Sequence, residues 1–67
     1  MKKRLVEKIA TLIYNGGCNE HTTAEVVDML KKGNYDIERL DNLIYFGGCN
    51  VFTTAEAIAM IRKEVKI

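Results

Sequence analysis

Apolar residues recur at intervals of three or four positions in four segments of the chain. In the first segment they occupy Val6, Ile9, Leu12 and Ile13, with charged residues nearby. This spacing is typical of an amphipathic helix, which returns a side chain to the same face about every 3.6 residues. The pattern returns at Val26, Val27, Met29 and Leu30, at Ile37, Leu40, Leu43 and Ile44, and at Ile58, Ile61 and Val65. The sequence therefore predicts an all-α protein of four short helices.

Glycines mark the ends of the first three predicted helices. Gly16 and Gly17 follow the first helix, Gly33 follows the second, and Gly47 and Gly48 follow the third. Glycine adopts the left-handed conformation just past a helix C-terminus without a steric cost. Since the chain has no proline, we expect these glycines and the polar caps to set the helix boundaries.

Two four-residue segments have the form of a capping box. Thr22–Glu25 and Thr53–Glu56 both read Thr-Thr-Ala-Glu. In such a box the first hydroxyl accepts from the backbone amide three residues on, and the carboxylate reaches back to the first amide. We therefore expect Thr22 and Thr53 to be the N-caps of the second and fourth helices, and Asp36 to cap the third.

One stretch of the chain occurs twice. Residues Ile13–Glu25 return as Ile44–Glu56 at an offset of 31 residues, and ten of the 13 positions are identical. A unit of this length cannot bury its apolar face alone and packs against its copy. We predict two tandem helical hairpins related by a pseudo-twofold axis, with repeat 1 at approximately residues 4–33 and repeat 2 at approximately residues 35–65.

Size and composition limit the classes of function. A chain of 67 residues makes a single domain with a thin stability margin. Oligomerisation, most simply as a homodimer, is the expected supplement. The net charge of +1 gives no strong electrostatic case for nucleic acid or an anionic membrane. No apolar run approaches the roughly 18 residues that span a bilayer, and the basic start lacks a signal-peptide core. We expect a cytoplasmic protein without a membrane segment.

The repeated loop has a structural interpretation and a chemical one. Structurally, its glycines end one helix, its cysteine is a small buried side chain, and its polar residues start the next helix. Chemically, Cys18 and His21 place a thiol and an imidazole three residues apart. Phe52 replaces the histidine in the second copy, and no acid, base and nucleophile converge, so we expect no enzyme activity and no small-molecule substrate.

The cysteines and the histidine also bear on metals and disulfides. Two cysteines and one histidine fall short of the four ligands of a closed zinc site, so we expect no metal and no cofactor. A Cys18–Cys49 disulfide stays open if a pseudo-twofold axis brings the loops together. A cytosolic location argues against it.

An anion-binding interpretation rests on the glycine loops and the basic residues. The paired hairpins distantly resemble the tandem helix-hairpin-helix domain, a resemblance that implies phosphate contacts through hairpin amides. Six residues separate Gly17 from Ala24 here, about twice the spacing of that motif. The candidate nucleic-acid contacts are basic residues at the expected helix ends: Lys2, Lys3, Arg4, Lys31, Lys32, Arg62 and Lys63. Dipole compensation at helix C-termini and ordinary solubility are the preferred explanation of these residues.

The differences between the two copies favour a binding function. Asn15, Glu20 and His21 of the first copy become Phe46, Val51 and Phe52 in the second. The fourth predicted helix is apolar on nearly every side, so these residues form either the centre of the core or an interface. The candidate partner-binding residues are Phe46, Val51, Phe52, Ala59 and Met60. The leading hypothesis is a protein–protein interaction or inhibitor-type regulatory module, and the alternative is a nucleic-acid-binding regulator.

Overall fold

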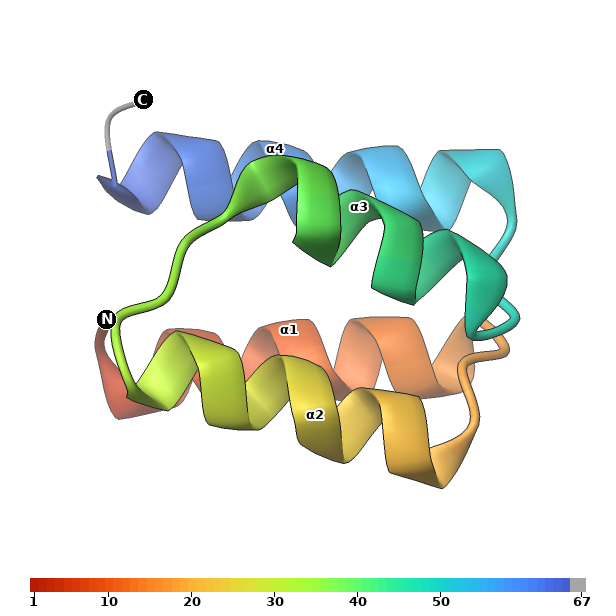
Figure 1. The fold of residues 1–67 in the computed structure, drawn as a ribbon, viewed down its shortest axis with the longest axis horizontal. Coiled ribbons are helices and arrows are strands. Elements are labelled where there is room, and N and C mark those ends of the chain that lie inside the picture. The colour runs from red at the N-terminus through yellow and green to blue at the C-terminus, as the bar shows by residue number, and fades with distance from the viewer. Residues whose placement is uncertain (66–67) are drawn as a thin grey trace.

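A computed structural model describes residues 1–65 and contains four helices in that range. They are α1 (Lys3–Asn15), α2 (Glu20–Lys31), α3 (Ile37–Phe46) and α4 (Val51–Val65). The chain runs up and down, so that both hairpin loops lie at one end of the bundle (Figure 1). The N-terminus and the connection between α2 and α3 lie at the other end. The predicted all-α fold of two helical hairpins is confirmed.

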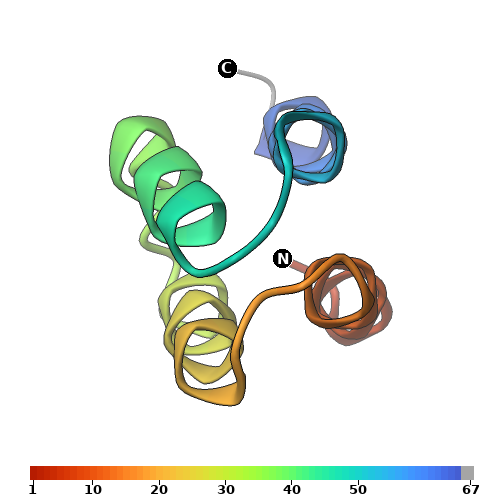
Figure 2. The ribbon, with the colours of Figure 1, turned by 90° about the vertical axis from the view of Figure 1, so that its right-hand side faces the viewer.

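Each helix packs against two neighbours around one core. Helix α1 contacts α2 and α4, and α3 contacts the same two helices. Seen along the bundle from the loop end, the four helices form a square (Figure 2). The largest fully buried side chains come from all four helices and are Ile9, Ile13, Val26, Leu30, Leu40, Ile44 and Ile61. Neither hairpin encloses this core by itself, as expected of a repeat that cannot bury its apolar face alone.

The two helices that follow the hairpin loops begin earlier than the sequence predicts. The Asn19 side chain accepts a hydrogen bond from the Thr22 amide at 2.7 Å, and the Asn50 side chain accepts from the Thr53 amide at 2.8 Å. Asparagine is therefore the N-cap of α2, and the matching bond gives Asn50 this role for α4. The prediction that Thr22 and Thr53 are the caps is wrong. The asparagine oxygens already accept from the threonine amides, which places both threonines inside the helices.

The starts of α3 and α1 differ in kind. Asp36 caps α3 as predicted, because its Oδ1 accepts from the Arg39 amide at 3.2 Å. Helix α1 has no side-chain cap and begins after Lys2. The amino group of Met1 donates to the Tyr35 hydroxyl at 2.9 Å, which ties this end to the connection before α3.

Three helices end on a glycine with positive φ. The angles are 115° at Gly17, 76° at Gly33 and 123° at Gly48. After each glycine the next amide donates back into the helix, as Cys18 does to the Ile13 carbonyl at 3.0 Å. This is the Schellman arrangement, which closes the last turn and needs a left-handed residue. The helix ends predicted from glycine are confirmed.

Candidate functional site

The two hairpin loops touch each other through reciprocal glycine contacts. A Cβ on Gly16 would overlap the Thr53 methyl group, and a Cβ on Gly47 would overlap the Thr22 methyl group. Similarly, a Cβ on Gly17 or Gly48 would overlap the backbone carbonyl of the other glycine. The loops therefore pack backbone against backbone, and only glycine permits this close approach. This contact fixes the geometry of the loop end.

Across the same contact, the two cysteines meet between the hairpins. Their Sγ atoms lie 3.1 Å apart, and both side chains are buried. The Cys18 thiol is 3.2 Å from the Ile44 carbonyl oxygen, and the Cys49 thiol is 3.2 Å from the Ile13 carbonyl oxygen. Each thiol can thus donate to the carbonyl of the opposite hairpin. The same two kinds of sulfur contact therefore occur in both hairpins.

The environment of Cys18 favours the neutral thiol. Its pKa rises from an ordinary value of 9.0 to about 12, first because burial desolvates the thiolate and then because of the contacts with Cys49. An activated cysteine nucleophile needs the opposite shift, toward a lower pKa. His21 lies exposed on the first turn of α2, while the Cys18 thiol faces Ile44 and Cys49. The structure does not join the thiol and the imidazole that lie close in the sequence.

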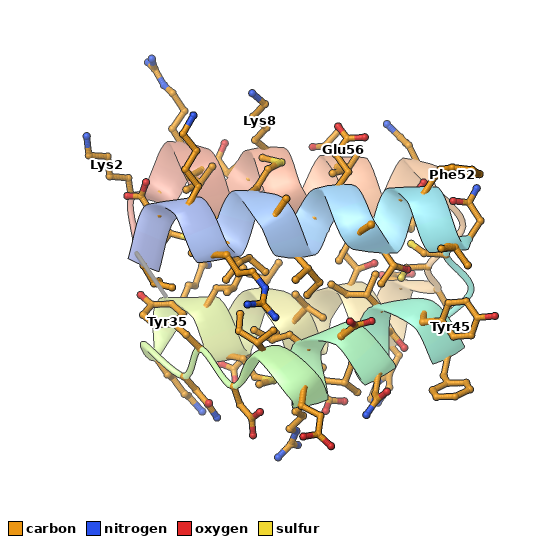
Figure 3. All side chains as sticks on the ribbon, turned by 90° about the horizontal axis from the view of Figure 1, so that it is seen from above. Lys2, Lys8, Tyr35, Tyr45, Phe52 and Glu56 are labelled. Carbon is orange, nitrogen blue, oxygen red and sulfur yellow. The ribbon has the colours of Figure 1, made fainter. Side chains whose placement is uncertain are left out.

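A group of exposed apolar side chains surrounds this loop contact. Phe52 is 86% exposed, Phe46 is 79% exposed and Val51 is 63% exposed. Tyr14 and Tyr45 are also exposed at the loop ends of α1 and α3. Figure 3 shows Phe52 and Tyr45 at this end, opposite Lys2 and Tyr35. We call these five residues, Tyr14, Tyr45, Phe46, Val51 and Phe52, the loop-end apolar surface.

Part of this surface is organised by contacts between its own members. The rings of Tyr45 and Phe46 meet edge to face with centroids 5.3 Å apart. Tyr45 and Val51 line one shallow hollow of about 230 Å³ between α3 and α4. Phe46 instead borders a wider groove of about 620 Å³ between α2 and α3, which Arg39 also lines. The second hairpin therefore presents apolar atoms on two sides of its loop.

The positions that differ between the repeated loops are all exposed. Hairpin 1, formed by α1 and α2, carries Asn15, Glu20 and His21. Hairpin 2, formed by α3 and α4, carries Phe46, Val51 and Phe52 at the equivalent positions. The same backbone arrangement thus accepts polar side chains in one copy and apolar side chains in the other. Packing of the fold does not explain why hairpin 2 is apolar here. The interpretation of Phe46 and Phe52 as the centre of the core is wrong, because they lie outside it.

The other two candidate partner-binding residues lie farther along α4. Ala59 is exposed and follows Phe52 by seven positions, about two helical turns. Met60 is half-buried and packs against the core. Most of the apolar character of α4 belongs to the core, through Ala57, Ile58 and Ile61. The structure therefore groups Phe46, Val51 and Phe52 at the loop end and leaves Met60 largely structural.

Sequence reasoning missed Tyr14 and Tyr45. Each directly follows a buried isoleucine, Ile13 or Ile44. One step along a helix turns a side chain by roughly 100°, which carries it away from the face that the isoleucine occupies. This rotation is the signal that could have identified both tyrosines as exposed.

The candidate nucleic-acid contacts gather at the end opposite the hairpin loops. They come from the start of α1 and from the ends of α2 and α4, which lie together there (Figure 1). All seven are exposed: Lys2, Lys3, Arg4, Lys31, Lys32, Arg62 and Lys63. Acidic groups partly offset them, since Lys32 pairs with Asp28 at 3.0 Å and Glu64 shares a hollow with Lys2 and Arg4. The large exposed apolar side chains are thus gathered at one end of the bundle, and these basic side chains at the other.

The hairpin amides from Gly16 to Asn19 and from Gly47 to Cys49 are engaged within the chain. The amides of Gly16, Gly17 and Cys18 donate to carbonyls of α1, and the equivalent amides of hairpin 2 donate to carbonyls of α3. The Asn19 amide donates across to the Gly47 carbonyl at 3.0 Å. Support for binding of a polyanion therefore comes from the basic end and not from the loops.

Comparisons with known proteins add no relative from which a function could be transferred. The chain matches no protein-family model, no curated protein and no solved structure. Among residues 1–65, no cluster of three or more His, Cys, Asp or Glu side chains is placed to hold a metal ion. Within the same range, no helix has the length and apolar character needed to cross a membrane.

Proposed function

We propose that this protein is a non-enzymatic, inhibitor-type regulatory module that binds a protein partner through the loop-end apolar surface. The observation that carries this proposal is the contrast between the two hairpins. At three equivalent exposed positions, hairpin 1 is polar and hairpin 2 has Phe46, Val51 and Phe52. Because the polar set is compatible with the same fold, the apolar set serves something other than folding.

Energetics support a binding role for these side chains. An exposed phenylalanine keeps apolar area in contact with water, and each Å² removed from water contributes about 25 cal/mol. Phe46 and Phe52 are both more than three-quarters exposed, so most of their area is available to a partner. Large aromatic side chains of this kind dominate the centres of protein interfaces. The surrounding polar groups of hairpin 1 would form a rim.

A second copy of the chain is the partner we expect first. A twofold end-to-end contact would place the same apolar residues against each other, and such isologous contacts are the commonest in soluble oligomers. It would also supplement the small core of a 67-residue domain. Within this proposal the protein acts in the cytoplasm, and its basic end stays exposed to solvent.

The test exchanges the residues of hairpin 2 for those of hairpin 1. The variant carries Phe46→Asn, Val51→Glu and Phe52→His, each taken from the equivalent position of the same chain. We expect wild-type protein to form a dimer in light scattering over a range of concentrations and the triple variant to be monomeric. Circular dichroism should show equal helical content, because all three positions are exposed.

Other outcomes separate self-association from binding to a different protein. If the wild-type protein is monomeric, a pull-down with the triple variant as the matched control tests for another partner. Equal retention of every protein by the two baits would contradict the proposal. Loss of helical content in the triple variant, or in Phe52→Asp, would show instead that these side chains support the fold.

Nucleic acid is the second candidate, favoured by the grouping of seven basic residues at one end. Their side chains could neutralise phosphates, and binding of this kind weakens steeply with salt. Fluorescence anisotropy with a duplex DNA at low salt tests the idea, with Lys31→Glu and Lys32→Glu together as the comparison. A signal that does not change at low salt removes this candidate.

A further inference from the structure

The pair of cysteines between the hairpins is a feature that partner binding does not use. Cys18 and Cys49 occupy the same position in the two loops, and their Sγ atoms are 3.1 Å apart. We propose that they form an oxidation site, at which hydrogen peroxide converts the two thiols to a disulfide that joins the two hairpins. The inference is independent of the proposed function, since the cysteines are buried and the loop-end apolar surface is exposed.

Backbone packing holds the two thiols together. Gly17 and Gly48 immediately precede the cysteines, and each approaches the other so closely that a Cβ would overlap the opposite carbonyl. The crossing of the loops therefore holds the backbone segments that carry the two cysteines close together. A disulfide has an S–S length of about 2.05 Å, so the sulfur atoms need to approach by only about 1 Å.

Oxidation would leave no backbone group without a partner. The carbonyl oxygens of Ile13 and Ile44, which face the two thiols, also accept from backbone amides. Ile13 accepts from the Cys18 amide at 3.0 Å, and Ile44 accepts from the Cys49 amide at 3.3 Å. When the S–H groups are lost, both carbonyls keep a donor. The site therefore tolerates the disulfide without the penalty of a buried unpaired acceptor.

The chemistry balances with one peroxide for each pair of thiols. One thiol gives up its proton, and its sulfur attacks a peroxide oxygen; the O–O bond breaks, and the leaving hydroxide takes up that proton, so the products are a sulfenic acid and water. Burial disfavours the thiolate of Cys18, which makes this first step slow at neutral pH. The second sulfur then attacks the sulfenic sulfur, the S–O bond breaks and a second water leaves. The two sulfurs lose two electrons in total, and the two thiol protons end in water. A small oxidant suits the site because Cys18 is only 3% exposed and Cys49 only 4%.

The test begins with native, reduced protein treated with hydrogen peroxide. After quenching, the protein is denatured, alkylated and digested with trypsin, and the peptides are identified by mass spectrometry. Cleavage after Lys8, Lys31, Arg39 and Arg62 isolates the cysteines in peptides 9–31 and 40–62. We expect these two peptides to be joined, and to separate on reduction. The joined pair is the readout because peroxide also oxidises methionine.

Thermal unfolding gives a second readout. Closing a chain segment of 31 residues should raise the melting temperature by more than about 10 °C, and a reductant should reverse the rise. Cys18→Ala and the nearly isosteric Cys18→Ser should show neither the joined peptides nor the rise. Circular dichroism confirms that these variants are folded before treatment.

Three results would overturn the proposal. The first is full alkylation of both thiols after peroxide treatment of the native protein. The second is joined peptides found only in covalent dimers on a non-reducing gel. The third is joined peptides that form only when peroxide is added to protein unfolded in urea, since native packing would then play no part.

Discussion

At the scale of single residues, the glycines that follow the helices have two different structural roles. Gly17 and Gly48 combine a positive φ with direct contact between their backbones. Gly33 also has a positive φ, but nothing lies within 4 Å of where its Cβ would be. The sequence shows five similar glycines, whereas the structure separates those that set a helix end from those that let the hairpins meet.

This difference predicts unequal costs for two alanine substitutions. Gly33→Ala should lower the free energy of unfolding by about 1 kcal/mol, the cost of a left-handed conformation with a Cβ. Gly17→Ala should lower it by roughly 3 kcal/mol or more, because its Cβ must also displace the Gly48 carbonyl. Urea denaturation of the two variants measures both values. Equal losses would mean that the loops do not pack as closely as described.

The cysteine pair predicts an alkaline limit to stability under reducing conditions. The pKa of Cys18 is about 12 in the folded protein and 9.0 for the ordinary thiol. The unfolded chain therefore loses the proton first as pH rises. The stability that the folded protein owes to the neutral Cys18 thiol is complete below pH 9. It falls between pH 9 and pH 12, by up to about 1.4 kcal/mol per pH unit.

The measurement compares the wild-type protein with the Cys18→Ala/Cys49→Ala double variant. The two proteins differ only in the thiols, so the difference between their unfolding free energies isolates the contribution of the thiols. Above pH 9 the free energy of unfolding of the wild-type protein should fall relative to that of the double variant. A difference that stays constant up to the alkaline limit would mean that the buried thiol does not have a raised pKa.

At the scale of secondary-structure elements, the helix starts are decided by asparagine. Asn19 and Asn50 precede the Thr-Thr-Ala-Glu segments by three residues and cap the helices themselves. Thr23 and Thr54 then donate their hydroxyls to the carbonyls of these asparagines. Both helices therefore begin almost a full turn earlier than predicted. In α4 this additional turn contains Val51 and Phe52.

The revised caps predict which substitution weakens α4. Asn50→Ala should lower the free energy of unfolding by about 1 kcal/mol, because the Thr53 amide loses its acceptor. Glu56→Ala should change it by less than about 0.5 kcal/mol, since Glu56 is exposed and has no capping role in this arrangement. Chemical denaturation of both variants measures these losses. A capping box at Thr53 would instead make Glu56→Ala more destabilising than Asn50→Ala.

At the scale of the whole molecule, the two ends of the bundle differ in chemistry. The hairpin loops, with Phe46 and Phe52, form an apolar end, and the helix termini opposite them form a basic end. The up-and-down path of the chain produces this separation, since it brings both loops together and places the ends of α2 and α4 beside the start of α1. A twofold contact through the apolar end would keep the basic ends of two copies apart.

This arrangement predicts a gain of association from the reverse exchange. Asn15→Phe, Glu20→Val and His21→Phe together would make hairpin 1 match hairpin 2 at exposed positions. We expect this variant to associate more tightly than the wild-type protein, because the apolar area at the loop end is enlarged. Sedimentation or light scattering at matched concentrations measures the effect. Association no stronger than that of the wild-type protein would argue against the loop end as the contact.

Helix content and hairpin order were predictable because they depend on local pattern. The spacing of Ile9 and Ile13, and the repeated glycine pairs, define helices and their ends within a few residues of chain. The helix starts were less predictable, since asparagine and threonine are both good N-caps and lie close together here. Only the hydrogen bonds of Asn19 and Asn50 distinguish them.

The candidate site was predictable in its residues but not in its exposure. Phe46, Val51 and Phe52 attract attention from the sequence because their copies in hairpin 1 are polar. Whether such residues fill a core or face solvent depends on which sides of α3 and α4 the other helices cover, and that is a property of the assembled bundle. Tyr14 and Tyr45 are a different case, because the helical rotation from the buried Ile13 and Ile44 already turns both tyrosines away from the core.

The sequence by itself determined the helices, their glycine ends and their order as two similar hairpins, because these follow from interactions between near neighbours along the chain. The tertiary structure decided that Cys18 meets Cys49, that Gly17 meets Gly48, and that the phenylalanines lie outside the core. These outcomes depend on how two hairpins cross, and residues 31 positions apart carry no local signal of their distance in space.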